Sequence, residues 1–372
     1  MEASGSRNCA NFEEKNSKES IESLWEDIDD GVLSDIVLDK RSYEEQDNDS
    51  AAPPEVIQVS KKLKTTTRPL DLFSPGRGYL WVSSLTAQMW CEQKLHYSLT
   101  LPVVEVEKPA ISKGTDLHLA RELADHDVVK IKVTSNEDIW AAKLLNLYSP
   151  VISFLLGTKM RREIPIFGFP FSHNVFVIGL IDEIQFDPET FTFDILELKT
   201  RSSSRTLPSK AQSKSHSLQV MLYKKLFDDL VKGQITKYSV AQHLRLELDK
   251  NFGEDINNSI TEHGLSCLNL SELMDCVFEK MKSLTCINQL LLEYCFQEDN
   301  STIGITEVKY NEEWLKETCD HYMKYWKGER PVEGVDIEEA FKCQSCEFAE
   351  VCEWREKKSK ELARKNSANS LK

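Results

Sequence analysis

The sequence has no apolar run that approaches the roughly 18 residues needed to span a bilayer, and its acidic amino terminus lacks the basic-then-apolar order of a secretory signal. Glycine and proline are scarce, at 14 and 12 of 372 residues, which excludes a collagenous chain. Hydrophobic residues make up 40%, enough to bury a sizeable core. We therefore expect a folded, soluble, intracellular protein with no membrane partner.

Basic residues are outnumbered, and a net charge of -15 argues at first against a polyanionic partner. The imbalance is concentrated in residues 1–50, which hold 15 acidic and 5 basic side chains, so that only -5 remains for the rest of the chain. Residues 1–70 are therefore predicted to form a disordered acidic tail. The body, residues 71–357, is nearly balanced and can hold a basic groove, and residues 358–372 are predicted to form a flexible basic tail.

Two β-like runs occupy the centre of the chain. Residues 175–181 and 191–198 are rich in β-branched and aromatic residues, and Asp187-Pro188-Glu189 between them has turn chemistry. Residues 164–169 can pair beside this hairpin, apolar residues at helical spacing surround it, and residues 271–297 look largely helical. We expect an α/β fold with a mixed sheet flanked by helices.

Three polar side chains are predicted to meet where the strands of this hairpin end. Asp182 ends the first strand, and Glu197 and Lys199 share one face of the second. Carboxylates suit Mg²⁺ or Mn²⁺, and such an ion can polarise a phosphodiester and lower the pKa of the attacking water, while Lys199 orients or helps to deprotonate that water. Because exposed strands carry such triplets by chance, an ordinary polar surface is the alternative for these three residues alone.

The neighbourhood of these residues strengthens the interpretation. Gly179 precedes Asp182 by three positions, and Gln219 and Tyr223 lie one turn apart on a predicted helix. His118 and Glu122 lie one turn apart on another predicted helix, earlier in the chain. In this order the set resembles the RecB-like branch of the PD-(D/E)XK nuclease superfamily, with Ile rather than Pro before the Asp. The resemblance implies a restriction-endonuclease-like core, His118 as an added Mg²⁺ ligand, and a Gln219–Tyr223 helix beside the active site.

Ten cysteines in a chain without a secretion signal are not expected to form a disulfide framework. Cys343, Cys346 and Cys352 supply three soft ligands within ten residues, and no His lies nearby to complete a zinc finger. Together with Cys91, far upstream on a predicted helix, they resemble the iron-sulfur staple of RecB-like nucleases, which implies a [4Fe-4S] cluster on these four residues. Zinc is the alternative, because thiolates bind both metals. The remaining cysteines are predicted to be buried or unstructured thiols, five of them in helical patterns.

Further stretches narrow the resemblance. Residues 117–123, 197–201 and 335–340, the last running into the cysteine motif, are similar to the exonuclease V family, and the similarity covers about residues 70–357. Membership implies a monomeric, Mg²⁺-dependent exonuclease that is specific for single-stranded DNA, carries a [4Fe-4S] cluster, releases short oligonucleotides and acts in DNA repair and genome maintenance. No motif indicates which DNA end is attacked. The alternatives are a non-catalytic iron-sulfur DNA-binding or scaffold protein, and a metal-dependent nuclease acting on RNA.

Basic residues follow the catalytic strand and can contact phosphates beside the metal site, with a solvated loop as the alternative. They include Arg201, Arg205, Lys210 and Lys214. We expect single-stranded DNA as the partner, read without base specificity through a narrow passage that admits an end and excludes duplex; single-strand-binding proteins are further expected partners. The tract Lys61-Lys62-Leu63-Lys64 resembles a nuclear-localisation patch or a solvated linker, so we expect the nucleus, with the cytosol as a second compartment.

Overall fold

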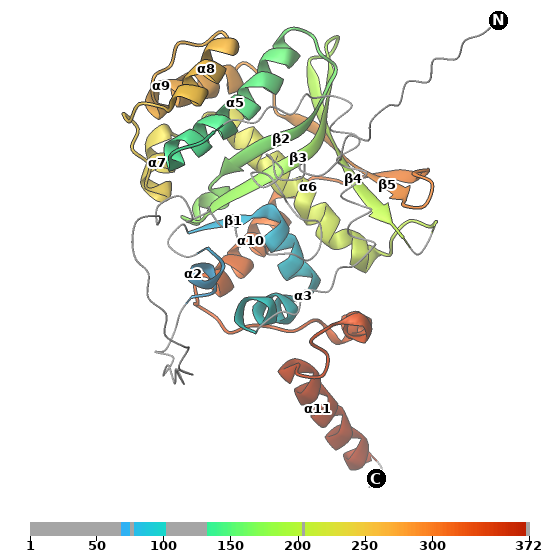
Figure 1. Ribbon diagram of the computed structural model, residues 1–372. Coiled ribbons are helices and arrows are strands. Elements are labelled where there is room, and N and C mark those ends of the chain that lie inside the picture. The colour runs from blue at the N-terminus through green and yellow to red at the C-terminus, as the bar shows by residue number, and fades with distance from the viewer. Residues whose placement is uncertain (1–67, 75–77, 102–131, 203–204, 370–372) are drawn as a thin grey trace, which may run out of the picture.

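The structure is a computed structural model that describes residues 68–74, 78–101, 132–202 and 205–369. The predicted acidic tail, up to residue 67, and His118 lie outside these ranges. No helix within them is both long and apolar enough to cross a membrane. Much of the predicted basic tail is helical, because α11 (Glu353–Asn369) extends through it and projects away from the body in Figure 1.

A mixed sheet of six strands forms the centre of the molecule, in the order β1-β3-β4-β5-β6, with β2 also paired to β3 (Figure 1). The strands are β1 (Tyr79–Trp81), β2 (Met160–Gly168), β3 (Phe176–Asp187), β4 (Thr192–Arg201), β5 (Ile287–Phe296) and β6 (Thr302–Glu307). β1–β3 and β4–β5 are parallel pairs, whereas β2–β3, β3–β4 and β5–β6 are antiparallel. The predicted α/β class with a mixed sheet is confirmed.

The predicted central hairpin is present as β3 and β4, and the additional strand is present as β2. The first strand is longer than predicted, however, because it continues to Asp187. Ile184 and Phe186 are buried, at 0% and 5% exposure, and their packing carries the strand beyond the acidic residue where it was expected to stop. The prediction that Asp182 ends its strand is therefore wrong: Asp182 lies inside β3.

Helices cover the sheet and build the two ends of the body. Before β4 they are α2 (Pro69–Phe73), α3 (Val82–Thr100) and α5 (Asn136–Leu155), and after it α6 (Lys210–Val231), α7 (Lys237–Leu244), α8 (Glu254–Glu262), α9 (Leu270–Met281) and α10 (Glu312–Trp326). In Figure 1, α5, α7, α8 and α9 gather at the upper left, and α2, α3 and α10 gather below the sheet. The chain thus brings its early helix α3 beside the late helix α10.

Helix α6 packs against strands β2 to β5 and carries the predicted apolar face. Leu218, Leu222 and Leu226 recur at i,i+4 spacing and are all fully buried, so this predicted helix is confirmed. The helix begins with a capping box, in which the Ser209 hydroxyl accepts from the Gln212 backbone N–H and the Gln212 side chain accepts from the Ser209 N–H. The capping box therefore fixes the residue at which α6 begins.

The prediction that residues 271–297 are largely helical is wrong in its second half. Helix α9 ends at Met281, and the apolar run Leu290–Leu292 lies in β5, parallel to β4. A parallel strand covered on both faces appears as a continuous apolar run, without the alternation that distinguishes a half-exposed strand. Cys295 consequently lies in this strand rather than in a helix.

Candidate active site

One edge of β3 is shared by two strands, which leaves a gap between them. β1 pairs with residues 176–178 of β3 and β4 pairs with residues 183–187, while β2 occupies the opposite edge. The predicted motif from Gly179 to Asp182 spans the interval between β1 and β4. The sheet therefore opens at the position where the catalytic carboxylate was predicted.

The predicted triplet converges at this opening. Asp182 Oδ2 accepts a hydrogen bond from the backbone N–H of Leu198 at 2.9 Å, which brings the carboxylate of β3 against β4 beyond the last paired residue. Lys199 Nζ lies 3.2 Å from Glu197 Oε1, and the two side chains are 12% and 2% exposed. Two carboxylates and an ammonium group, two of them nearly removed from solvent, thus share one end of the hairpin.

Helix α6 covers this site through the predicted pair Gln219 and Tyr223. Gln219 Nε2 donates to the Tyr223 hydroxyl at 2.9 Å, so the i,i+4 pair does act as one unit. The Tyr223 ring packs against Gly179, where a Cβ would lie only 2.7 Å from Tyr223 Cε1. Glycine is therefore required at the first position of G-x-x-D because an aromatic ring of α6 lies against the strand.

Two residues that the sequence did not single out complete the same side of the site. His216 of α6 lies one turn before Gln219, and its Nδ1 is 3.1 Å from the hydroxyl of Tyr294 in β5. Burial raises the pKa of Tyr294, and the charges of Lys199 and Arg201 oppose that rise, so its hydroxyl lies in their field. The i,i+3 spacing from Gln219 could have revealed His216, but Tyr294 was hidden in a strand predicted as helix.

The donor set at the opening fits a hard divalent cation. Asp182 and Glu197 bring acidic oxygens, which Mg²⁺ prefers over nitrogen or sulfur ligands. The third predicted ligand, His118, lies outside the described residues, and among those described no group of three His, Cys, Asp or Glu side chains could hold a metal ion. The Mg²⁺ ligand set stays a prediction.

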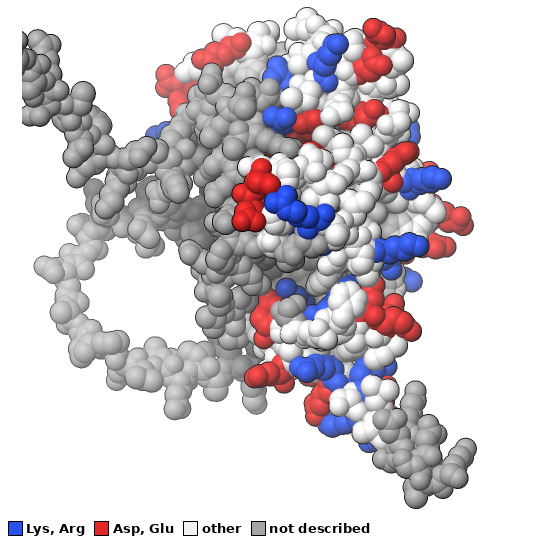
Figure 2. All heavy atoms as spheres, turned by 90° about the vertical axis from the view of Figure 1, so that its right-hand side faces the viewer, with Lys and Arg blue, Asp and Glu red and all other residues white. Residues whose placement is uncertain are grey.

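The predicted DNA-contacting residues occupy different surroundings. Arg201 is half-buried at the end of β4, and Lys210 and Lys214 are exposed on the first turns of α6. Arg205 instead lies over the Phe296 ring, 4.2 Å from its centroid, and pairs with Asp299 at 2.9 Å. On the face shown in Figure 2, basic side chains alternate with acidic ones and form no continuous basic area.

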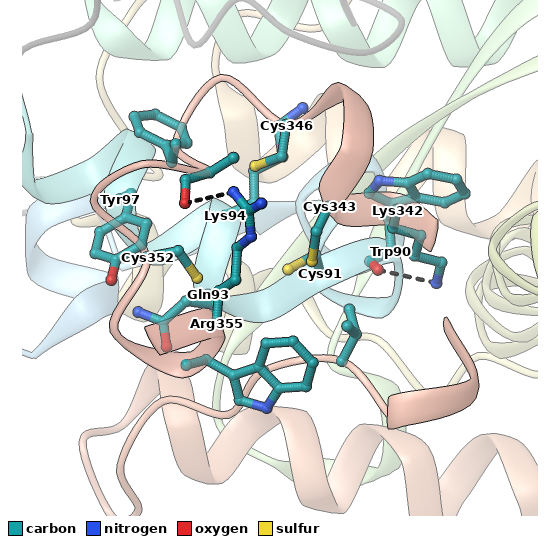
Figure 3. Close-up of a pocket in the computed structure, with 15 residues that line it drawn as sticks. Trp90, Cys91, Gln93, Lys94, Tyr97, Lys342, Cys343, Cys346, Cys352 and Arg355 are labelled. Carbon is teal, nitrogen blue, oxygen red and sulfur yellow. Dashed lines mark hydrogen bonds between the residues drawn. The ribbon is translucent and has the colours of Figure 1, made fainter. Parts of the chain in front are cut away.

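The four cysteines predicted to bind a cluster line one pocket of about 540 Å³, part of it open to solvent (Figure 3). Cys91 comes from α3, and Cys343, Cys346 and Cys352 come from the segment before α11. Burial raises the pKa of the Cys91 thiol, and repulsion from the thiolates of the other three adds to this effect. Thiols are the ligands that an iron-sulfur cluster uses, but no three of these four described cysteines are placed as a group that could hold a metal ion. The cluster stays a prediction.

The backbone of α3 is broken at Cys91. This residue has φ -166° and ψ 106°, an extended conformation between two helical halves. The carbonyl of Trp90 next to the break accepts a hydrogen bond from Lys342 Nζ at 3.0 Å, and the same ammonium lies 4.5 Å from the centre of the Trp90 ring. The residue before Cys343 thereby ties the carboxyl-terminal segment to the kink that presents Cys91.

A buried ion pair that the sequence did not predict joins the same two segments. Arg330 donates to both carboxylate oxygens of Glu92, at 2.6 and 2.5 Å. The Glu333 backbone N–H and Gln88 Nε2 donate to that carboxylate as well, at 2.8 and 2.6 Å, and Trp326 Nε1 donates to Gln88 Oε1 at 2.8 Å. Hydrogen bonds therefore connect α3 to α10 independently of any metal.

None of the remaining described cysteines forms a disulfide. Cys267, Cys295 and Cys319 are buried, as predicted, whereas Cys276 and Cys286 are only half-buried. The helical environment is confirmed for Cys276 and Cys319 but is wrong for Cys267 and Cys286, which lie between regular elements, as it is for Cys295. Cys9 lies outside the described residues.

Comparisons with known proteins give a consistent result. The model of the family described as "Exonuclease V - a 5' deoxyribonuclease" matches residues 68–194, 189–268 and 261–355. The chain is similar to Exonuclease V of Danio rerio, with 32% identity over 368 residues, 89% of this chain and 92% of that protein. The solved structure named "Crystal structure of SSO0001" is similar over 75% of this chain and 87% of that one, at 13% identity and a TM-score of 0.32, which is too low to support an argument.

Proposed function

The chain belongs to the exonuclease V family, and from this membership we propose that it is a Mg²⁺-dependent 5′ exonuclease that degrades single-stranded DNA into short oligonucleotides. The family is described as 5′ deoxyribonucleases. This description favours an exodeoxyribonuclease over the alternative of a non-catalytic scaffold protein. It also indicates attack at the 5′ end, which no sequence motif indicated. The single-strand preference, the metal and a role in DNA repair and genome maintenance in the nucleus are parts of the proposal.

The observation that carries this proposal is the convergence of Asp182, Glu197 and Lys199 at the opening between β1 and β4. The Glu197 carboxylate is nearly buried beside the Lys199 ammonium, a placement that is costly unless the site uses it. These are the groups that hydrolysis of a phosphodiester with a divalent ion requires.

Each residue has a distinct part in the proposed chemistry. Asp182 and Glu197, with His118, would hold Mg²⁺, which when bound polarises the scissile phosphate and makes the attacking water more acidic. Lys199 orients that water, and its charge offsets the negative charge that develops on the phosphate oxygens. Gln219 and Tyr223 of α6 lie along one side of the site, where they exclude bulk solvent.

Recognition of the strand is proposed to depend on phosphate contacts. Arg201 at the end of β4 and the exposed Lys210 and Lys214 on α6 lie along the path that leaves the catalytic strand. Such contacts are tolerant of sequence and sensitive to salt. Arg205 is a weaker candidate than the other three, because Asp299 already neutralises it.

We also propose that Cys91, Cys343, Cys346 and Cys352 hold a [4Fe-4S] cluster, with zinc as the alternative metal. All four sulfurs line one pocket, and no carboxylate is among the residues that line it, which favours a soft metal. The cluster would join the start of the folded body to its end. The enzyme is proposed to act as a monomer, with single-strand-binding proteins as partners.

The test compares wild type with Asp182→Asn and Glu197→Gln on linear single-stranded DNA labelled at the 5′ or the 3′ end, with Mg²⁺ and with a chelator. Loss of one ligand charge should slow cleavage about a thousandfold, because several kcal/mol of transition-state stabilisation depend on it. Glu189→Gln is the matched control, since this carboxylate is exposed in the turn at the other end of the same hairpin.

Cleavage of different substrates distinguishes the alternative functions. A closed single-stranded circle and blunt duplex should resist the enzyme, and an RNA strand of the same sequence should be cut more slowly than DNA. Near wild-type turnover by Glu197→Gln would remove the site assignment, and rapid cutting of the circle would remove the requirement for a free end. Equal cleavage of RNA and DNA would favour the alternative of a metal-dependent nuclease that also acts on RNA.

A further inference from the structure

Tyr294 lies directly beside the catalytic lysine. Tyr294 and Lys199 are register partners in the parallel pairing of β4 and β5, and partners in such a ladder project from the same side of the sheet. Tyr294 is 1% exposed, so its ring is fixed among neighbours rather than in solvent. The Tyr294 ring is therefore placed next to Lys199 on the same side of the sheet.

The Tyr294 hydroxyl is held from the opposite layer. His216 Nδ1 lies 3.1 Å away, and the two ring centroids are 5.8 Å apart. The side chain of Thr306 in β6 is a second hydrogen-bond partner of this hydroxyl, so the phenol is held from both α6 and β6. His216 shares its helix with Gln219 and Tyr223, so α6 contacts β5 through His216 and β3 through Tyr223, the two strands on either side of β4.

We propose that the hydrogen bond between His216 and Tyr294 positions Lys199 for the hydrolytic step, so that both are positioning residues of the active site. The inference rests on the proposed function, in which Lys199 orients the attacking water. A lysine stem carries about 2 kcal/mol of rotamer entropy, and the 3.2 Å contact with Glu197 acts at the tip of the side chain. A rigid ring beside the stem selects the rotamer in which the ammonium group reaches both Glu197 and the opening.

The charges around Tyr294 agree with this role. Burial raises the pKa of the phenol, and the opposing effects of Lys199 and Arg201 place its hydroxyl near both cations. The phenol therefore stays neutral beside Lys199 and does not compete with Glu197 for the charge of the lysine.

The molecule contains an almost identical pair that serves as a control. His96 Nδ1 of α3 lies 3.1 Å from the hydroxyl of Tyr325 in α10, and Tyr325 is also 1% exposed. The two pairs share their chemistry, distance and burial. They differ in location, since only the His216–Tyr294 pair adjoins the catalytic strand.

The experiment measures kcat, KM and the thermal midpoint of full-length Tyr294→Phe, His216→Leu, their double variant, His216→Asn and Tyr325→Phe on linear single-stranded DNA with Mg²⁺. Tyr294→Phe and His216→Leu should each lower kcat about tenfold with KM changed less than about twofold, because a misplaced lysine slows the step without weakening binding. The double variant should be no slower than either single one. His216→Asn places an amide at the position of Nδ1 and should recover most of the rate.

Tyr325→Phe should lower the thermal midpoint about as much as Tyr294→Phe and leave kcat unchanged. The proposal is overturned if Tyr294→Phe lowers only the midpoint, if the loss appears in KM, or if the two single losses multiply in the double variant. Glu197→Gln is measured in parallel: an active Glu197→Gln would refute the proposed function, whereas an inactive one beside a fully active Tyr294→Phe would refute this inference alone.

Discussion

Replacing Glu92 by glutamine should destabilise the protein more than any other single loss of charge discussed above. The Glu92 and Arg330 side chains are only 6% and 11% exposed, and four donors, from two side chains and one backbone amide, converge on this carboxylate. Glutamine keeps the shape but removes the charge, and it turns an N–H group toward the donors of Arg330. The cationic partner is then left buried and uncompensated.

The expected cost is about 3–5 kcal/mol, the usual loss when one member of a buried ion pair is removed. The pKa of Arg330 agrees, because it is raised: burial alone would lower it, and the hydrogen bonds and charge of Glu92 outweigh that effect. The double variant Glu92→Gln with Arg330→Met should recover part of the loss, since no unpaired charge stays buried.

The assay is urea unfolding at neutral pH followed by tryptophan fluorescence, which is sensitive here because Trp326 donates to Gln88 within the same network. The matched control is Glu279→Gln. Its partner Lys282 lies at 2.6 Å, but the two side chains are 70% and 44% exposed, so the loss should stay below about 1 kcal/mol. A loss under about 1 kcal/mol for Glu92→Gln, or equal losses at the two sites, would refute the reasoning.

Three further outcomes are expected. Gly179→Ala should cost about 1–3 kcal/mol and slow cleavage, because its Cβ would lie 2.7 Å from Tyr223, whereas Gly304→Ala, with its nearest neighbour at 3.4 Å, should change both far less in the same urea and kinetic assays. Hydrogen bonds from Ser301 and Arg205 lower the pKa of Asp299 to about 2, below the unfolded value of about 3.9. Their stabilising effect should therefore be complete above about pH 4 and disappear toward pH 2. Carboxyl ¹³C shifts should follow this titration, and Asp299→Asn should lack it. Cys91→Ser should abolish the brown colour and bound iron, measured by absorbance and elemental analysis, whereas Cys286→Ser should retain both; a colourless wild type that contains zinc would overturn the cluster proposal.

Local patterns in the sequence predicted the centre of the site. The hairpin follows from two runs rich in β-branched and aromatic residues with a turn between them, and the spacing of Gln219 and Tyr223 predicted a pair that is in fact hydrogen-bonded. These signals need only neighbouring residues. The extension of β3 past Asp182 could not be predicted in the same way, because it depends on the packing of Ile184 and Phe186 in the assembled sheet.

Long-range features were beyond local patterns. β5 was predicted as helix because a strand covered on both faces lacks the alternation of apolar and polar residues. Tyr294, which lies in β5, was therefore not recognised as a residue near the site. Glu92 appears as an ordinary helical acid, and its partner Arg330 lies 238 residues later. Periodicity carries no information across such a separation. Only the resemblance of the four cysteines to a known iron-sulfur staple indicated that α3 meets the carboxyl-terminal part of the chain.

The separation between Glu92 and Arg330 in the sequence also determines how long after Glu92 its partner is synthesised. Translation at about 5–20 residues per second takes roughly 10–50 s to add the residues between them. During that interval Gln88, Glu92 and the break at Cys91 have left the ribosome while the groups that complete them have not been synthesised. Helix α3 therefore stays without its late partners during this interval, and chains interrupted between residues 308 and 329 should be recognised by chaperones and proteases although all six strands are already made.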